Sequence, residues 1–196
     1  MNIMAILKNN RTVAHLDLDA FFVSVEIKKD ASLSGKPLII GGQSQRGVVA
    51  SCSYEARKAG VHSAMPIRMA KRLCPDALII KGDMESYAKE SALVTQVIAD
   101  KAPLFEKASI DEFYLDLSGM DRYFGCFDWT KELRKKIISE TGLPISSGVS
   151  INKLISKVST DEAKPNGIIQ IKKGDEKDFL HPLPVQKLPG VGKVTQ

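Results

Sequence analysis

The chain has few cysteines and histidines, and their scarcity excludes several kinds of protein. The 196 residues include three cysteines, which are widely spaced and form no Cys-x-x-Cys pair. A disulfide framework or a structural zinc site is therefore not expected, and we interpret Cys52, Cys74 and Cys126 as small buried side chains or free thiols. The three histidines are scattered and share no metal-binding spacing.

Long hydrophobic runs are also lacking. Runs such as the one at 77–80 are far shorter than the about 20 apolar residues that span a bilayer. The N-terminal segment 1–7 has neither the charged region nor the cleavage site of a signal peptide. We therefore expect a cytoplasmic protein with no membrane partner.

The composition that is present is that of a globular protein with a small excess of positive charge. Hydrophobic residues make up 43% and charged residues 26% of the chain, which argues against disorder, collagen and coiled coil. Lys and Arg number 28 against 23 Asp and Glu, so the formal net charge is +5. This charge permits an acidic partner such as nucleic acid without requiring one.

The hydrophobic pattern predicts an α+β fold of the ferredoxin-like, βαββαβ type. When an insertion at about 29–82 is set aside, the remaining elements alternate in the order strand, helix, strand, strand, helix, strand. The inserted segment is itself predicted to be a small α/β unit. The main elements expected outside it are strands at 12–18, 105–108, 113–117 and 144–151, a helix at 85–101, a helix at 129–141 that Asp128 caps, and a helix that Asn152 caps and that ends at about 161.

Three acidic residues that are far apart in the sequence would meet in this fold. The strands at 105–108 and 113–117 form a hairpin, and Asp111 and Glu112 lie at its bend. Asp17 ends the first strand, which in this fold ends beside that bend. Mg²⁺ is a suitable counter-ion because it prefers oxygen ligands, and two such ions can stabilise both oxygens of a phosphoryl transfer. Solvent-facing acids at strand ends explain these residues equally well at this point. Asp19 and Asp116 flank the same elements, but the alternation of side chains along a strand would point Asp116 in another direction, and we interpret Asp116 as structural.

Six segments match known motifs in the same order and spacing. They are 15–26, 51–61, 109–116, 148–153, 163–167 and 188–193. Together they resemble the Y-family, or translesion, DNA polymerases, in their bacterial branch. The first three are similar to the family's first motif, its fingers motif and its catalytic hairpin. The others are similar to the last palm motifs and to the first helix–hairpin–helix turn of the thumb.

The resemblance implies roles for individual residues. Asp17, Asp111 and Glu112 match the metal-binding carboxylates of the family, and they would be its catalytic residues. The backbone carbonyl of Leu18 matches a further metal ligand, and Phe22 matches the steric gate that rejects ribonucleotides. The positions that match nucleotide contacts are Phe21, Phe22, Ser51, Tyr54, Arg57 and Lys164.

The resemblance also implies an activity, cofactors and partners. The activity would be low-fidelity, template-directed DNA synthesis past damaged bases, with two Mg²⁺ ions that Mn²⁺ could replace. Primer–template DNA and a deoxynucleoside triphosphate are the expected partners of a monomer, and a sliding clamp is expected for the full-length protein only. The expected domains are a palm at 1–28 and 83–174, fingers at 29–82 and the start of a thumb at 175–196, so the chain is expected to be a truncated fragment without the little-finger domain.

Two other functions remain open on the sequence. The chain could be a catalytically impaired fragment that binds nucleotide and metal, or a nucleotide cyclase, since cyclases share the palm topology and paired acids. Tyr54-x-x-Arg57 and the segment 188–193 argue against a cyclase. Taken singly, each matched residue also fits an ordinary role, such as helix core for Phe22 and a solvated turn for Lys164.

Overall fold

The computed structural model describes residues 11–42, 44, 46–120 and 125–192. These residues form two compact units, one of Met1–Asp19 with Leu93–Gln196 (unit 1) and one of Ala20–Ala92 (unit 2). The N-terminal segment 1–10 and Lys193, the last residue of the predicted thumb motif, lie outside the described residues. The boundaries of palm, fingers and thumb stay a prediction.

Unit 1 is built on a five-stranded sheet in the order β5-β6-β1-β7-β8. Strand β1 is antiparallel to both of its neighbours, β6 and β7, and β8 is parallel to β7. The first four strands have the predicted ferredoxin-like order, and β8 extends it at one edge. The strands are β1 (Val13–Leu18), β5 (Phe105–Lys107), β6 (Glu112–Asp116), β7 (Ile145–Ser150) and β8 (Ile168–Gln170).

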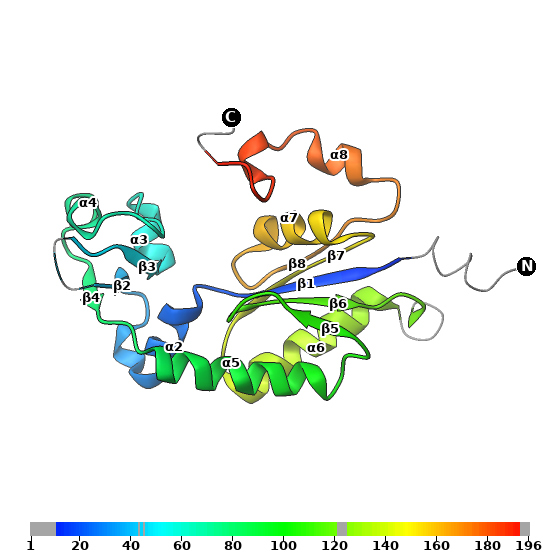
Figure 1. Cartoon of the computed structure of the whole chain (residues 1–196), viewed down its shortest axis with the longest axis horizontal. Coiled ribbons are helices and arrows are strands. Elements are labelled where there is room, and N and C mark those ends of the chain that lie inside the picture. The colour runs from blue at the N-terminus through cyan, green and yellow to red at the C-terminus, as the bar shows by residue number, and fades with distance from the viewer. Residues whose placement is uncertain (1–10, 43, 45, 121–124, 193–196) are drawn as a thin grey trace, which may run out of the picture. The chain divides into compact units, whose positions relative to one another are not determined.

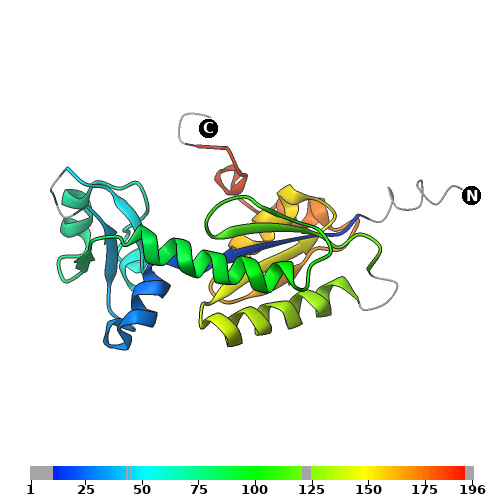
Figure 2. The ribbon, with the colours of Figure 1, turned by 60° about the horizontal axis from the view of Figure 1, so that its bottom comes forward.

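Helices cover both faces of this sheet. Helix α7 (Lys153–Ala163) lies on one face, where it packs on β7 and β1, and α6 (Cys126–Thr141) lies on the other (Figures 1 and 2). Helix α7 begins after Asn152, whose side chain accepts the Ile155 amide hydrogen at 2.9 Å, as the sequence predicts. Helix α5 (Met84–Ala99) contains the division between the units, and α8 (Glu176–Leu180) and the 3₁₀ helix η3 (Val185–Lys187) follow β8.

The predicted start of α6 is wrong. The sequence suggested a helix that begins at Trp129 behind an Asp128 cap, but α6 begins at Cys126, directly after Gly125. Gly125 has a φ of 68°, which glycine adopts without steric cost. The chain can therefore turn into the helix three residues before Asp128. Asp128 lies in the first turn instead, where its charge still favours the positive end of the helix.

Unit 2 contains a three-stranded sheet in the order β3-β2-β4. Strand β2 is antiparallel to β3 and parallel to β4. The unit includes the predicted α/β insertion and, in addition, the first helix and the start of α5. Its elements are α2 (Phe21–Lys29), η1 (Ala31–Leu33), β2 (Leu38–Gly41), β3 (Val49–Cys52), α3 (Tyr54–Lys58), α4 (Ile67–Leu73) and β4 (Leu78–Ile80).

Buried apolar side chains form a hydrophobic core in unit 2. In unit 2 a core of buried residues joins β2 and β3 to α3 and α4; its members are Ile39, Val49, Cys52, Ala56, Val61, Met65, Ile67, Ala70 and Cys74. Two of the three cysteines, Cys52 and Cys74, are buried in this core, and Cys126 is buried in α6. All three are free thiols, as expected.

None of the helices in the described ranges is both long and apolar enough to cross a membrane.

The close packing of α7 on the sheet depends on Gly148. A Cβ atom at this position of β7 would lie 2.1 Å from the carbonyl oxygen of Ser156 and 2.7 Å from the Cβ of Ser159. Any larger side chain would therefore push α7 away from β7 and β1. The residues that α7 contributes to the edge of the sheet would move with it.

Gly148→Ala is accordingly expected to lower the free energy of unfolding by about 3 kcal/mol, because backbone and side-chain atoms of α7 have to shift. Urea unfolding followed by circular dichroism measures the change. Gly192→Ala is the control, since no atom of the described residues, apart from its chain neighbours, lies within 4 Å of a Cβ placed there. Equal stability of the two variants would contradict the packing argument.

Candidate active site

The end of β1 and the start of β6 bring the predicted acids together. Asp17 and Glu112 are paired residues of these antiparallel strands, so their side chains share a face and their Cα atoms are about 4.5–5.5 Å apart. The amide of Leu18 donates to the carbonyl oxygen of Asp111 at 3.1 Å, which places Asp111 beside the end of β1. The structure thus brings all three acids to one edge of the sheet.

The carboxylate of Asp17 is buried and pairs with a lysine. Its Oδ2 lies 2.7 Å from the Nζ of Lys164, the residue that follows α7. Burial raises the pKa of Asp17 to about 7; Lys164 opposes this rise, whereas the nearby Asp111 and Glu112 add to it. One lysine therefore does not offset the cost of placing this charge beside two other carboxylates.

Glu112 lies between a lysine and a histidine. The Nζ of Lys157, on α7, is 2.5 Å from Oε1, and the Nε2 of His15 is 3.8 Å from Oε2, too far for a hydrogen bond. His15 and Lys157 lower the pKa of Glu112 to about 2 against the effect of burial. His15 is itself buried, which lowers its pKa, and its Nδ1 lies 2.9 Å from the hydroxyl of Thr160.

Asp111 is held by its own turn. The hydroxyl of Ser109 donates to Oδ1 of Asp111 at 2.6 Å and accepts the amide hydrogen of Glu112 at 3.1 Å. Each of the three carboxylates thus has a separate partner within the chain. Within the described ranges, no group of three or more His, Cys, Asp or Glu side chains is arranged to hold a metal ion.

The chemistry of this edge nevertheless suits a hard divalent cation. The three carboxylates and the carbonyl of Leu18 offer only oxygen ligands, which Mg²⁺ prefers. Burial raises the pKa of Asp17, and the neighbouring Asp111 and Glu112 add to the rise; a bound cation would lower this pKa again. Asp17, Asp111 and Glu112 could hold such an ion once Lys157 and Lys164 release their oxygens.

The remaining predicted nucleotide contacts, apart from Lys164, lie in unit 2. Tyr54 begins α3, and the guanidinium carbon of Arg57 is 5.1 Å from the centre of its ring. The Nε of Arg57 donates to the carbonyl of Cys52 at 3.2 Å, which fixes the guanidinium near the end of β3. Ser51 is buried in β3. Tyr54 and Arg57 therefore form one local group of a cation and an aromatic ring.

Phe21 and Phe22 begin α2, and two residues that the sequence analysis missed support them. The ring of Phe22 stacks on Tyr87 with centroids 4.3 Å apart and an angle of 12° between the planes. Tyr87 is fully buried and donates its hydroxyl to Oε1 of Glu26 at 2.7 Å. Phe21 is buried, whereas Phe22 is only half-buried. No local pattern could have linked Tyr87 to Phe22, because the two are separated by most of unit 2.

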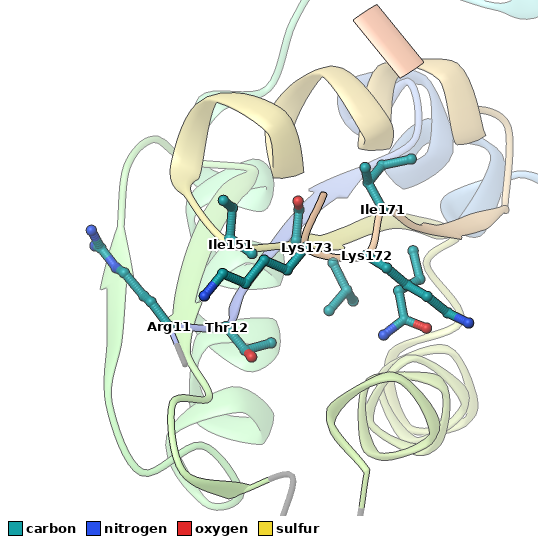
Figure 3. A pocket seen from close by; sticks show the side chains of 9 residues that line it. Arg11, Thr12, Ile151, Ile171, Lys172 and Lys173 are labelled. Atoms are coloured by element: carbon teal, nitrogen blue, oxygen red, sulfur yellow. The ribbon is translucent and has the colours of Figure 1, made fainter. Parts of the chain in front are cut away.

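A pocket of about 220 Å³ lies at the opposite end of the sheet of unit 1 (Figure 3). Arg11, Lys172 and Lys173 line it together with Thr12, which precedes β1, and the end of β7. Because Asp17 is near the far end of β1, this pocket is not the site of the carboxylates. None of the predicted site residues lines it.

Comparison with known proteins assigns the family. A sequence model of the impB/mucB/samB family matches residues 16–161, and a model of the IMS family HHH motif matches residues 173–196. The chain belongs to the impB/mucB/samB family. The second match includes the predicted helix–hairpin–helix segment at 188–193.

Curated relatives in this family carry the name DNA polymerase IV. One, from Treponema denticola, is 45% identical over 93% of this chain and 46% of its own length. Another, from Clostridium perfringens, is 44% identical over 97% of this chain and 54% of its own length. The chain thus spans about half the length of the relatives it matches.

Solved structures of the family agree with the fold. DinB from Sulfolobus solfataricus has a TM-score of 0.85 and 33% identity, covering 93% of this chain and 55% of that one. An insertion ternary complex of Dbh DNA polymerase has a TM-score of 0.84 at the same identity and coverage. The predicted Y-family resemblance and the α+β fold are confirmed.

In the metal-free protein, Asp17 is expected to reduce stability as pH rises. Its pKa of about 7 lies above the ordinary value of 3.8, so the folded state retains a proton that the unfolded state loses. The stability linked to that proton is present below about pH 4 and is lost as pH rises to about 7. Urea unfolding with a chelator across this window measures the effect.

Asp17→Asn should flatten this part of the stability curve, because it removes the titrating group. Asp128→Asn, which removes an exposed carboxylate from the first turn of α6, should leave the slope as it is. A slope in Asp17→Asn equal to that of the unaltered chain would show that another group carries the dependence.

Proposed function

We propose that this chain is the catalytic part of a template-directed DNA polymerase that copies damaged templates at low fidelity. The observation that carries the proposal is the pairing of Asp17 with Glu112 across β1 and β6, with Asp111 beside them. Membership of the family and the relatives named DNA polymerase IV support it. The family argues against the alternative of a nucleotide cyclase.

In this proposal Asp17, Asp111 and Glu112, at the end of β1, form a carboxylate edge of unit 1 that would bind the reacting phosphates through metal ions. Asp17, Asp111 and Glu112, with the carbonyl of Leu18, would hold two Mg²⁺ ions, and Mn²⁺ could replace them. When bound, such ions stabilise the attacking primer 3′-oxygen and the leaving pyrophosphate of an in-line transfer. The chain's own part is to fix the oxygens that hold the ions on a rigid strand pair.

Cationic side chains would bind the triphosphate. Lys164, which pairs with Asp17 in this structure, would exchange that carboxylate for a phosphate oxygen of the bound nucleotide. Arg57 and Tyr54 offer a guanidinium and a hydroxyl from unit 2, and the buried Ser51 lies at the end of the preceding strand. Charge-assisted hydrogen bonds of this kind are stronger than neutral ones and suit a departing pyrophosphate.

Sugar selection would depend on Phe22. Its ring is held from one side by Tyr87, and the half-buried side chain remains accessible. A flat ring next to the sugar leaves no room for a 2′-hydroxyl, and Phe21 supports it from the same turn. Small residues on the facing strand, such as Ala50 and Ser51, leave space around a base pair and so favour tolerance over fidelity.

The whole protein's partners follow from the same proposal. Primer–template DNA and a deoxynucleoside triphosphate are the substrates, and a related structure is an insertion ternary complex of a DNA polymerase. We further propose a cytoplasmic monomer whose full-length form contacts a sliding clamp. A nucleotide- and metal-binding fragment with impaired catalysis is the second candidate.

Glu112→Gln is expected to lower the rate of Mg²⁺-dependent primer extension by about 10²–10³-fold, because an oriented charge at the reaction centre is lost. The assay uses the longest native protein that contains this chain. Glu106→Gln is the matched control, since Glu106 lies on β5 and, like Glu112, pairs with a lysine of α7. Similar activity in both variants would remove Glu112 from the metal site.

Phe22→Ala is expected to raise ribonucleotide incorporation by about tenfold or more relative to deoxynucleotide incorporation, since the clash with the 2′-hydroxyl is removed. Competition between labelled ribo- and deoxynucleoside triphosphates measures this ratio. Phe127→Ala, on α6 of unit 1, should leave it unchanged. An unaltered ratio in Phe22→Ala would return Phe22 to a packing role.

A further inference from the structure

Asp19 is a buried acid that follows β1 and takes no part in the proposed metal site. Its side chain is 1% exposed. The hydroxyl of Ser146, on β7, approaches both carboxylate oxygens, at 2.9 and 3.0 Å, and the backbone amide of Asn166 donates to Oδ2 at 2.8 Å. The carboxylate therefore joins the end of β1 to β7 and to the turn at 164–167.

The turn at 164–167, between α7 and β8, is also held from α6. The Nη2 of Arg134 donates to Oδ1 of Asn166 at 3.0 Å, and its Nε donates to the carbonyl of Ile145 at 2.9 Å. The amide of Gly167 donates to the hydroxyl of Ser146 at 3.3 Å. The turn is thus fixed by one carboxylate, one guanidinium and one hydroxyl.

Lys164 begins this turn, and its ammonium reaches the carboxylate edge. The Nζ of Lys164 lies 2.7 Å from Asp17 and 3.4 Å from Asp161. A lysine has a flexible stem, and ordering it costs conformational entropy. Fixing the backbone two residues further along limits where that stem can start, which confines the ammonium to the region of Asp17.

We propose that Asp19 is a positioning residue for Lys164. It holds the turn at 164–167 so that the lysine points at the carboxylate edge, and through the lysine it sets the affinity for the triphosphate of the incoming nucleotide. The predicted effect on triphosphate affinity rests on the proposed function. The hold on the turn, meaning the contacts by which Asp19 fixes residues 164–167, does not rest on it. The two acids of the segment Asp17-Leu18-Asp19 therefore act differently: one carries charge at the site, and the other places the cation that faces it.

The first test is a double-mutant cycle on the longest native protein that contains this chain. Asp19→Asn should raise the KM for dATP by about tenfold and change kcat by less than about threefold, because the lysine is displaced while the metal ligands remain. Lys164→Ala should raise the KM as well. The double variant should match Lys164→Ala alone, because Asp19 acts only through the lysine.

Asp161→Asn is the matched control. It removes the other acid that contacts Lys164 but leaves the contacts of the turn in place, so the KM should change by less than about twofold. Effects of Asp19→Asn and Lys164→Ala that multiply in the double variant would overturn the proposal, since Asp19 would then act independently of the lysine.

The second test needs no activity and uses this chain itself. In a ¹H–¹⁵N spectrum, the amide of Asn166 should lose the shift that a hydrogen bond to a carboxylate gives it when Asp19 becomes Asn. Arg134→Lys, a milder change to the same turn, should move this resonance in part, and it serves if Asp19→Asn does not fold. Lys135→Gln is the control: Lys135 is an exposed residue of α6, the helix of Arg134, and pairs with Glu132. This change should leave the Asn166 resonance where it is.

The outcomes separate the inference from the proposed function. An Asn166 resonance that Asp19→Asn and Arg134→Lys leave unchanged overturns the hold on the turn. If Lys164→Ala leaves the KM for dATP unchanged, the nucleotide role of Lys164 in the proposed function is wrong, and the predicted effect on triphosphate affinity falls with it. The hold on the turn is then decided by the resonance alone.

Discussion

Electrostatic repulsion at one edge of a sheet is the constraint on which the structure of unit 1 depends. Asp17 and Glu112 are paired across β1 and β6, and Asp111 adjoins them. Carboxylates in a buried, crowded place disfavour their charged forms, and the raised pKa of Asp17 reflects this. The fold must therefore bring cations to this edge, from its own side chains or from solution.

Helix α7 and the turn that follows it supply the chain's own cations. Lys157 lies on α7 and contacts Glu112, and Lys164 follows the helix and contacts Asp17. Both contacts require the helix to lie close to β7, which the missing side chain of Gly148 allows. A packing detail in the middle of the sheet thus contributes to the charge balance at its end.

The fold and the acids could be predicted from the sequence because each depends on patterns that the chain displays. The alternation of strands and helices indicated the βαββαβ order, and that order places the end of β1 beside the hairpin bend. Asn152 was recognised as a cap because its type and position suffice. The start of α6 could not be predicted, because the backbone conformation of Gly125 decides it and the Asp128 side chain does not.

The residues that were missed act through tertiary contacts. Lys157 is one of two lysines on the amphipathic helix α7, and only the fold shows that it faces Glu112. Asp19 has no role that the sequence predicts, because its partners, Ser146 and Asn166, are more than 120 positions away. Tyr87 is likewise linked to Phe22 only by packing.

The pairing of β1 with β6 has a consequence for how this site tolerates change. Side chains alternate between the faces of a strand, so sliding one strand by a single residue would send every side chain of that strand to the opposite face. Asp17 faces Glu112 only in the observed alignment. The segment between them can therefore be long, and here it includes the whole of unit 2, whereas one residue added within β6 would dismantle the site while leaving the composition of the sheet almost unchanged.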